Sequence, residues 1–277
     1  SKFAEIARSA ELKHELTRRI APFMLRRRKA DVCRELPPKQ EQLLYCEMEQ
    51  PQRALYRAVE EQAAEQCRRL REGDPRVTSI HLLASIMRMR QVCCAPELLP
   101  DHAGDGVPSA KLELLNELLN ETLDSGHKVL LFSQFTSMLS LIRSRLTEQN
   151  IPFEYLDGST HDRSGRIEHF NTDPNVRVFL LSLKAGGVGL NLTSADTVIL
   201  FDPWWNPAVE DQAADRTHRI GQTRSVNCIR LVVRDSIEER VLELHERKRA
   251  LFNDLVEEST EALSSLGVDD LEFLLGQ

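Results

Sequence analysis

The feature that most constrains the fold is a series of short apolar runs between residues 109 and 235. They are VLLF from Val129, FEYL from Phe153, VFLL from Val178, TVILF from Thr197 and NCIRLVV from Asn227. Segments with helical patterning separate them, at 136–149, 163–171 and 209–220. Short, continuously apolar strands that alternate with helices are typical of a parallel sheet covered on both faces. The pattern therefore predicts one α/β domain over about 109–235.

The segments on either side of this domain are helical in character. Residues 52–71 repeat apolar side chains at steps of three and four, and a second stripe comprises Ile237, Val241, Leu244, Leu251 and Leu255. Between the front helices and the α/β domain lies the linker DHAGDGVP, residues 101–108. We expect Ser109 to cap the next helix and Gly126 to end it.

Composition and charge limit the classes of protein that the chain can belong to. Hydrophobic residues make up 41% and charged residues 29%, with a net charge of −7, as in folded globular proteins. No apolar stretch is long enough to span a bilayer, so no membrane partner is expected. The six cysteines include no Cys-x-x-Cys pair, which predicts no metal site and a reduced, intracellular protein. The absence of an initiator methionine suggests a cut from a longer protein.

Polar residues follow the first two apolar runs. In a parallel sheet the carboxyl ends of the strands meet at one edge, where ligands bind. Ser133 and Gln134 follow the first run at the start of a helix, where hydroxyl and N–H groups can hold phosphate. Asp157-Gly158-Ser159-Thr160 follows the second run, with Arg163 behind it. Taken singly, each segment fits an ordinary cap or turn as well as a binding loop.

The next two runs lead into less common loops. SLKAGGVGLNL places Lys184, Ala185 and the glycines at 186, 187 and 189 after the third run. Glycines let the backbone approach a ligand, so a phosphate-facing loop and a plain turn both fit, but the loop is neither GxGxxG nor a P-loop. The fourth run leads into DPWWNP, residues 202–207, whose tryptophans fit either a core or a stacking role.

The strongest local signal is the segment DQAADRTHRIGQ, which begins at Asp211. On a helix, Gln212, Arg216 and Arg219 would project from one face, because four and three residues separate them. Two guanidiniums on one face repel each other unless an anion or carboxylates meet them. Arginine also suits the charge that develops on a transferred phosphoryl group. The structural alternative is a surface network with Asp211 or Asp215.

These motifs occur in an order found in a known family. Ser-Gln after a strand, Asp-Gly-Ser-Thr, Ala-Gly-Gly-x-Gly-Leu-Asn-Leu, Asp-Pro-x-Trp-Asn-Pro and Gln-x-x-x-Arg-x-His-Arg-Ile-Gly-Gln resemble the second RecA-like lobe of SWI/SNF-type superfamily-two DNA translocases. Nearer the start, PFMLRRRKADVCRELPPKQ looks like the family's link from its first lobe, and MRMRQVCCAPELL resembles its Leu-Arg-Gln-x-Cys-x-x-Pro segment. SIEERVLELHERKRALFNDLV is similar to its brace helix, so the resemblance covers nearly the whole chain.

The resemblance implies an α/β fold, a RecA-like three-layer domain with a central parallel sheet, a helical N-terminal subdomain and a C-terminal brace helix. Residues 1–40 would be a basic linker from the first lobe and 41–108 the helical subdomain. Residues 109–235 would be the second lobe and 236–277 the brace with an acidic tail. The family's first lobe, with its P-loop, is missing from these residues. We therefore expect ATP with Mg²⁺ to be bound mainly by that lobe, and this chain to be inactive alone.

The resemblance also implies roles for residues in an ATP-driven motor on double-stranded DNA. Arg216 and Arg219 match the arginine fingers that reach the γ-phosphate, supported by Gln212, and Gly187 and Gly189 match the loop that senses ATP. The positions that match DNA-facing residues of the family are Ser133, Gln134, Thr160, Arg163, Lys184, Ala185 and Trp205. The implied partners are double-stranded DNA, the first RecA-like lobe of the same polypeptide and a DNA-bound protein complex.

A second class of function stays open at this point. The chain would then be a non-catalytic DNA- or protein-binding module derived from such a lobe, docking through its basic front or acidic tail. Retention of Arg216 and Arg219 favours the motor, because a scaffold has no use for a paired guanidinium face. The expected location is the cytoplasm if the protein is prokaryotic and the nucleus if it is eukaryotic.

Overall fold

The computed structural model describes residues 36–186, 190–219, 221–253 and 268–275. Most of the basic segment 1–40, the glycines Gly187 and Gly189, and most of the acidic tail fall outside the described residues.

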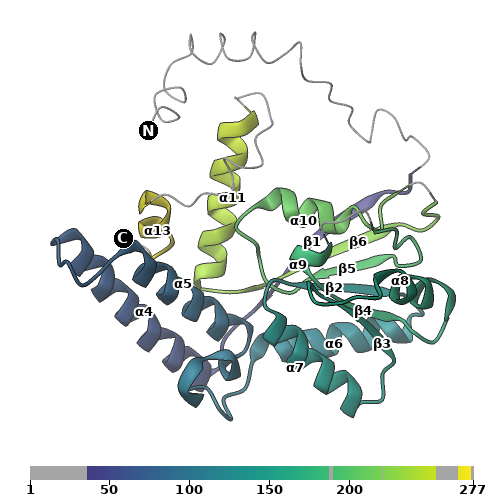
Figure 1. Ribbon diagram of the computed structural model, residues 1–277, viewed down its shortest axis with the longest axis horizontal. Coiled ribbons are helices and arrows are strands. Elements are labelled where there is room, and N and C mark those ends of the chain that lie inside the picture. Colours follow the sequence, from purple (N-terminus) through teal and green to yellow (C-terminus); the bar gives the residue numbers. More distant parts are fainter. Residues whose placement is uncertain (1–35, 187–189, 220, 254–267, 276–277) are drawn as a thin grey trace, which may run out of the picture.

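The described residues form a parallel sheet of six strands in the order β1-β6-β5-β2-β4-β3 (Figure 1). Each neighbouring pair is parallel. The strands are β1 (Lys39–Cys46), β2 (Val129–Ser133), β3 (Phe153–Leu156), β4 (Val178–Ser182), β5 (Thr197–Leu200) and β6 (Val226–Val233). The apolar runs thus correspond to β2 through β6, and the predicted α/β class with a central parallel sheet is confirmed.

Alternate residues of the central strands face opposite helical layers, because side chains in a strand repeat with a period of two. Val129 and Leu131 pack with α6 (Ala110–Asp124) and α7 (Thr136–Glu148). Leu130 and Phe132 pack on the other face, where α8 (Arg163–Thr172), the short α9 (Leu183–Gly186) and α10 (Pro207–Ala214) lie (Figure 1). Burial on both faces explains why these strands are continuously apolar. The result is a three-layer RecA-like arrangement.

The predicted signals at the ends of α6 are present. The hydroxyl of Ser109 accepts a hydrogen bond from the backbone N–H of Leu112 at 3.2 Å, which satisfies one of the free donors of the first turn. Gly126, just past the helix, has a φ of +78°, a conformation that favours glycine.

A second core lies beside the sheet, among helices from both ends of the chain. It is formed by α4 (Gln50–Arg71), α5 (Ser79–Cys94), α11 (Ile237–Asn253) and α13 (Val268–Leu274). Two short 3₁₀ turns, η2 (Pro96–Leu98) and η3 (Pro100–His102), follow α5. Helix α13 lies where the sequence analysis expected only an acidic tail, and its Leu271 and Leu274 are buried. None of the helices described here is both long and apolar enough to cross a membrane.

A fully buried ion pair joins this helical core to the sheet domain. The ammonium of Lys111 in α6 lies 2.5 Å from both carboxylate oxygens of Glu238 in α11. The same carboxylate accepts a hydrogen bond from the backbone N–H of Val233 at 2.9 Å. Burial opposes the ammonium charge, but the adjacent carboxylate raises the pKa of Lys111 above its ordinary value. The start of the brace helix is thereby fixed to the first helix of the lobe.

Strand β1 is a feature that the sequence analysis missed. Residues 41–46 were placed at the start of the helical subdomain, yet they pair in register with β6 along the whole strand. The segment KQEQLLYC exposes most of its side chains, and Leu44 is the residue that packs against the sheet core. Edge strands commonly carry charged and polar side chains, so this strand has no continuous apolar run to reveal it.

Candidate functional site

The loops that follow β2 and β5 meet at the carboxyl edge of the sheet around Asp202. This carboxylate is buried, and its two oxygens accept hydrogen bonds from the hydroxyl of Ser133 and from the backbone N–H of Gln134. Burial raises the pKa of Asp202, while Arg90 and Ser133 act in the opposite direction. The Ser133 side chain is fully buried, so its predicted contact with DNA stays a prediction.

Arg90 of α5 connects these two loops, and sequence reasoning assigned it no role. Its Nη1 donates to the side-chain oxygen of Gln134 at 2.9 Å, and its Nη2 donates to the backbone oxygen of Pro203. Nη2 also lies 3.8 Å from Asp202, and the guanidinium carbon is 4.2 Å from the ring centroid of Trp205. The signal that could have found it was its place in the segment MRMRQVCC, within the family resemblance.

Several elements hold the loop that carries Trp205. The backbone N–H of Trp204 donates to the Glu210 carboxylate at 2.7 Å, and His245 of α11 hydrogen-bonds the Trp204 backbone oxygen. Asn206 caps α10 by accepting from the N–H of Ala208 at 3.0 Å. The Trp205 side chain is half-buried at this anchored position. A loop held in this way can present an aromatic ring in a fixed orientation.

The loops after β3 and β4 lie next along the same edge, because β4 pairs in parallel with β2 and β3 pairs in parallel with β4. Thr160 is half-buried, and its hydroxyl accepts from the N–H of Asp157 at 3.0 Å. Arg163 is the first residue of α8 and is also half-buried. Ala185 is buried, and its N–H donates to the Ser182 hydroxyl, so its predicted DNA contact stays a prediction. Lys184 is the second residue of α9, and its side chain is outside the described set.

The arginine segment departs from the helix predicted over 209–220. Helix α10 ends at Ala214, so Gln212, Arg216 and Arg219 do not lie on one helical face, and that geometric expectation is wrong. The Thr217 hydroxyl donates to the Ala214 carbonyl at 2.8 Å, and the Arg216 carbonyl instead accepts from the N–H of Leu192 at 3.3 Å. The backbone N–H groups of Arg216 and Thr217 bond the carbonyls of Ala213 and Ala214, three residues back, so the α-helical pattern is broken here. Gln212 is exposed on α10.

Arg216 and Arg219 nevertheless lie near each other. Arg216 is only 6% exposed, and burial lowers the pKa of its guanidinium, with the nearby charge of Arg219 adding to the effect. The Nη1 of Arg219 donates to the Leu190 carbonyl at 3.4 Å. Leu190 and Leu192 follow the glycine loop along the chain, so the fold brings the arginine segment alongside the continuation of that loop.

Carboxylates meet part of this segment, as the structural alternative required. The charge of Asp215 acts against the lowering of the Arg216 pKa. Asp211 lies 3.8 Å from Arg230, a buried side chain that also bonds Glu210 at 2.9 Å. The network of carboxylates therefore includes Asp211, which lies near Arg230, while Arg216 and Arg219 remain two adjacent cations.

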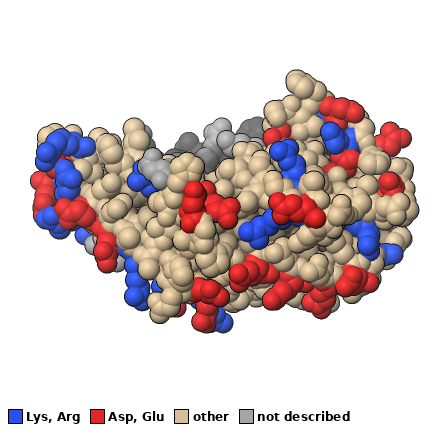
Figure 2. Space-filling view, turned by 90° about the horizontal axis from the view of Figure 1, so that it is seen from below, with Lys and Arg blue, Asp and Glu red and all other residues tan. Residues whose placement is uncertain are grey.

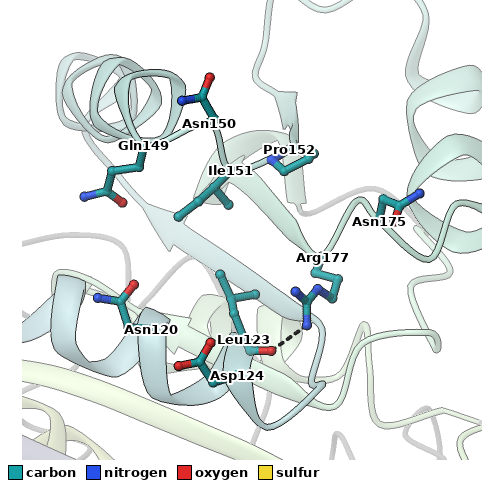
Figure 3. Close-up of a pocket in the computed structure, with 9 residues that line it drawn as sticks. All are labelled: Asn120, Leu123, Asp124, Gln149, Asn150, Ile151, Pro152, Asn175 and Arg177. Carbon is teal, nitrogen blue, oxygen red and sulfur yellow. Dashed lines mark hydrogen bonds between the residues drawn. The ribbon is translucent and has the colours of Figure 1, made fainter.

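A cavity of about 410 Å³ lies at the opposite edge of the sheet (Figure 3). Its lining comes from segments that precede β2, β3 and β4, and Arg177 donates to the Leu123 carbonyl at its side. The residues around it are Asn120, Leu123, Asp124, Gln149, Asn150, Ile151, Pro152, Asn175 and Arg177. None of the predicted site residues is among them, so the candidate site is not this cavity.

The surface seen in Figure 2 carries acidic and basic side chains that are interspersed. The coloured residues there form no continuous basic patch. Duplex DNA is attracted by extended positive potential, which this side of the molecule does not offer.

The fold therefore defines an α/β protein of the RecA-like class, with motif loops at the carboxyl edge and an arginine pair beside the glycine-loop segment. Comparison with family models identifies the descriptions "Helicase conserved C-terminal domain" over residues 110–221 and "SNF2-related domain" over residues 2–98. The chain belongs to the SNF2-type helicase family, which confirms the resemblance seen in the sequence.

Solved structures of the family share this fold. The C-terminal part of the Fun30 ATPase domain matches with a TM-score of 0.71 and 27% identity, covering 87% of this chain and 97% of that one. The SWI2/SNF2 ATPase core of Sulfolobus solfataricus, in complex with double-stranded DNA, matches with a TM-score of 0.67 and 33% identity. That match covers 96% of this chain and 56% of the core.

Curated relatives are much longer than this chain. An uncharacterized ATP-dependent helicase of Mycoplasma pneumoniae is 36% identical over 260 residues, which cover 93% of this chain and 25% of the relative. Protein CHROMATIN REMODELING 4 of Arabidopsis thaliana is 40% identical over 258 residues, or 88% of this chain and 12% of that protein. The chain thus spans a quarter or less of these relatives.

Proposed function

We propose that this chain is the second motor lobe of an ATP-dependent double-stranded-DNA translocase that remodels protein–DNA complexes. The observation that carries the proposal is that Arg216 and Arg219 lie close together, next to the segment that follows the glycine loop. Two adjacent guanidiniums are stabilised by an anion, and a nucleotide phosphate is the anion that such a pair suits best. The family's ATP-dependent helicases and its DNA-bound core support this assignment.

In this function Arg216 and Arg219 act as arginine fingers on ATP that is bound mainly by the first lobe. Their charge would stabilise the transferring γ-phosphoryl group, an effect of about 10³ to 10⁵ in rate for arginine fingers in general. The described residues contain no cluster of three or more metal-ligating side chains, and we assign Mg²⁺ to the first lobe with the nucleotide. Gln212, Gly187 and Gly189 are proposed to sense ATP.

The DNA-facing surface is proposed to be the carboxyl edge of the sheet. The loops after β2, β3, β4 and β5 lie side by side there, which offers hydroxyl, amide, guanidinium and indole groups to one backbone. Phosphate contacts of this kind position a protein on DNA without reading its sequence, as a translocase requires. The residues assigned to this surface are Ser133, Gln134, Thr160, Arg163, Lys184, Ala185 and Trp205.

The first test is the ATPase rate of the full-length protein, with and without duplex DNA, next to that of this 277-residue chain. We expect turnover in the full-length protein that rises with duplex, and no appreciable turnover in the chain alone. A full-length protein that binds DNA or proteins but never hydrolyses ATP would instead support the non-catalytic binding module.

The second test changes the arginines in the full-length protein. Arg216→Ala and Arg219→Ala should each leave ATP binding largely intact while hydrolysis falls by about 10³ or more. Arg224→Ala is the matched control, because this exposed arginine just beyond the segment pairs with Asp196 at 3.0 Å. Full DNA-stimulated turnover in both finger variants would show that the assignment is wrong.

A further inference from the structure

The guanidinium of Arg90 is completely buried between two loops that carry proposed DNA contacts. It donates to the side chain of Gln134 in the loop after β2 and to the backbone of Pro203 in the loop after β5. It also lies over the Trp205 ring, 4.2 Å from the centroid. Helix α5, which carries Arg90, belongs to the separate helical core, so this contact spans two parts of the fold.

The chemistry of arginine fixes how Gln134 is oriented. A guanidinium has only donors, so the amide must turn its oxygen toward Arg90, and its NH₂ group must point elsewhere. That nitrogen is buried and finds no acceptor among the described residues. A phosphate oxygen is an acceptor without donors of its own, and would satisfy this nitrogen where the binding of DNA exposes it.

The same guanidinium also constrains Trp205. A planar cation over an indole face is favoured, and a buried one more so than an exposed one. Two hydrogen bonds hold the Arg90 guanidinium at Gln134 and Pro203, so its contact with the Trp205 ring fixes the ring's position relative to both loops. A lysine would retain the positive charge near Asp202, but it would lose the two fixed N–H donors and the planar face that contacts the indole.

We propose that Arg90 is a positioning residue that sets the Gln134 amide and the Trp205 ring for contact with the DNA backbone. This inference rests on the proposed function, because it takes these two residues as DNA contacts. Arg90 itself does not touch the DNA. It links the helical core to the DNA-facing loops, so that a shift of α5 would move both contacts together.

The test is Arg90→Lys, examined in two ways. In the full-length protein, we expect the duplex concentration for half-maximal ATPase stimulation to rise about tenfold. Turnover at saturating duplex should fall by a smaller factor. In the 277-residue chain with Trp204→Phe, which leaves Trp205 as its one tryptophan, we expect the emission maximum to move to longer wavelength because the ring loses its buried partner. The second readout needs no DNA.

The matched control is Tyr56→Phe, which removes another buried hydrogen bond of the helical core. The Tyr56 hydroxyl accepts from the N–H of Ile237 at 2.7 Å and does not reach the DNA-facing loops. We expect a lower melting temperature with no change in duplex dependence. If Tyr56→Phe raised the duplex requirement as much as Arg90→Lys, loss of stability would explain both, and the proposal would be overturned.

Two further outcomes separate this inference from the proposed function. Unchanged Trp205 emission and unchanged duplex dependence in Arg90→Lys would refute the positioning role. The other outcome is a shifted emission while neither Arg90→Lys nor Trp205→Ala alters the duplex dependence. That result would overturn the DNA contact assigned to this loop, although Arg90 would still be shown to position Trp205.

Discussion

Replacing Lys111 by methionine should destabilise the chain strongly, because it leaves the Glu238 carboxylate buried without its cation. The Lys111 ammonium is 2.5 Å from both carboxylate oxygens, and neither side chain has measurable exposure. Methionine is similar in length and apolar, so the change removes charge with little loss of packing. The buried carboxylate retains one hydrogen bond, from the backbone N–H of Val233.

The magnitude follows from the energetics of buried charges. Removing one partner of a buried ion pair typically costs about 3 to 5 kcal/mol, because the remaining charge stays desolvated. The surviving bond to Val233 places the Lys111→Met loss near the lower end of that range. Adding Glu238→Gln removes the stranded charge and keeps an acceptor for Val233, so the double variant should regain about 1 to 2 kcal/mol.

The assay is urea unfolding of the wild type, both single variants and the double variant, read by far-UV circular dichroism as a double-mutant cycle. Arg68→Met is the matched control, since the same change at an exposed pair with Glu65 and Glu72 should leave the midpoint almost unchanged. A Lys111→Met loss below about 1 kcal/mol, or strict additivity of the two changes, would refute the reasoning.

Two other predictions concern salt and pH. Arg163→Ala in the full-length protein should reduce the slope of log affinity for duplex against log salt by about 0.9, the value for one phosphate contact; weaker binding with an unchanged slope would argue against such a contact. Burial opposes ionisation of Glu41, but Lys39 and Arg230 lower the pKa of Glu41 to about 2 from its ordinary 4.5. Its ionised form therefore contributes stability above pH 4.5 that is lost as the pH falls toward 2. As the pH falls from 4.5 to 2, the melting temperature of Glu41→Gln should therefore drop less than that of the wild type. Equal drops in the two proteins would contradict the assignment.

Much of the fold was accessible from the sequence, because strands buried on both faces must be apolar throughout. The runs at Val129 and Val178 became β2 and β4, and Ser109 and Gly126 mark the ends of α6 as expected. The order of the motifs was also enough to identify the family. These features are local or depend on residue order, so they do not require knowledge of how distant segments meet.

Other features were decided only by the tertiary structure. Strand β1 is polar and becomes part of the sheet only because β6 offers it a partner edge. Helix α10 ends at Ala214, where the N–H groups of Arg216 and Thr217 bond carbonyls three residues back, and the Arg216 carbonyl bonds Leu192, far away in the sequence. In the sequence, Arg90 cannot be distinguished from the other charged residues of its helix, because only folding buries it against Gln134 and Trp205. Sequence patterns report what each segment must bury, whereas the choice of partner for an edge strand, a helix end or a buried charge depends on contacts that exist only once the chain has folded.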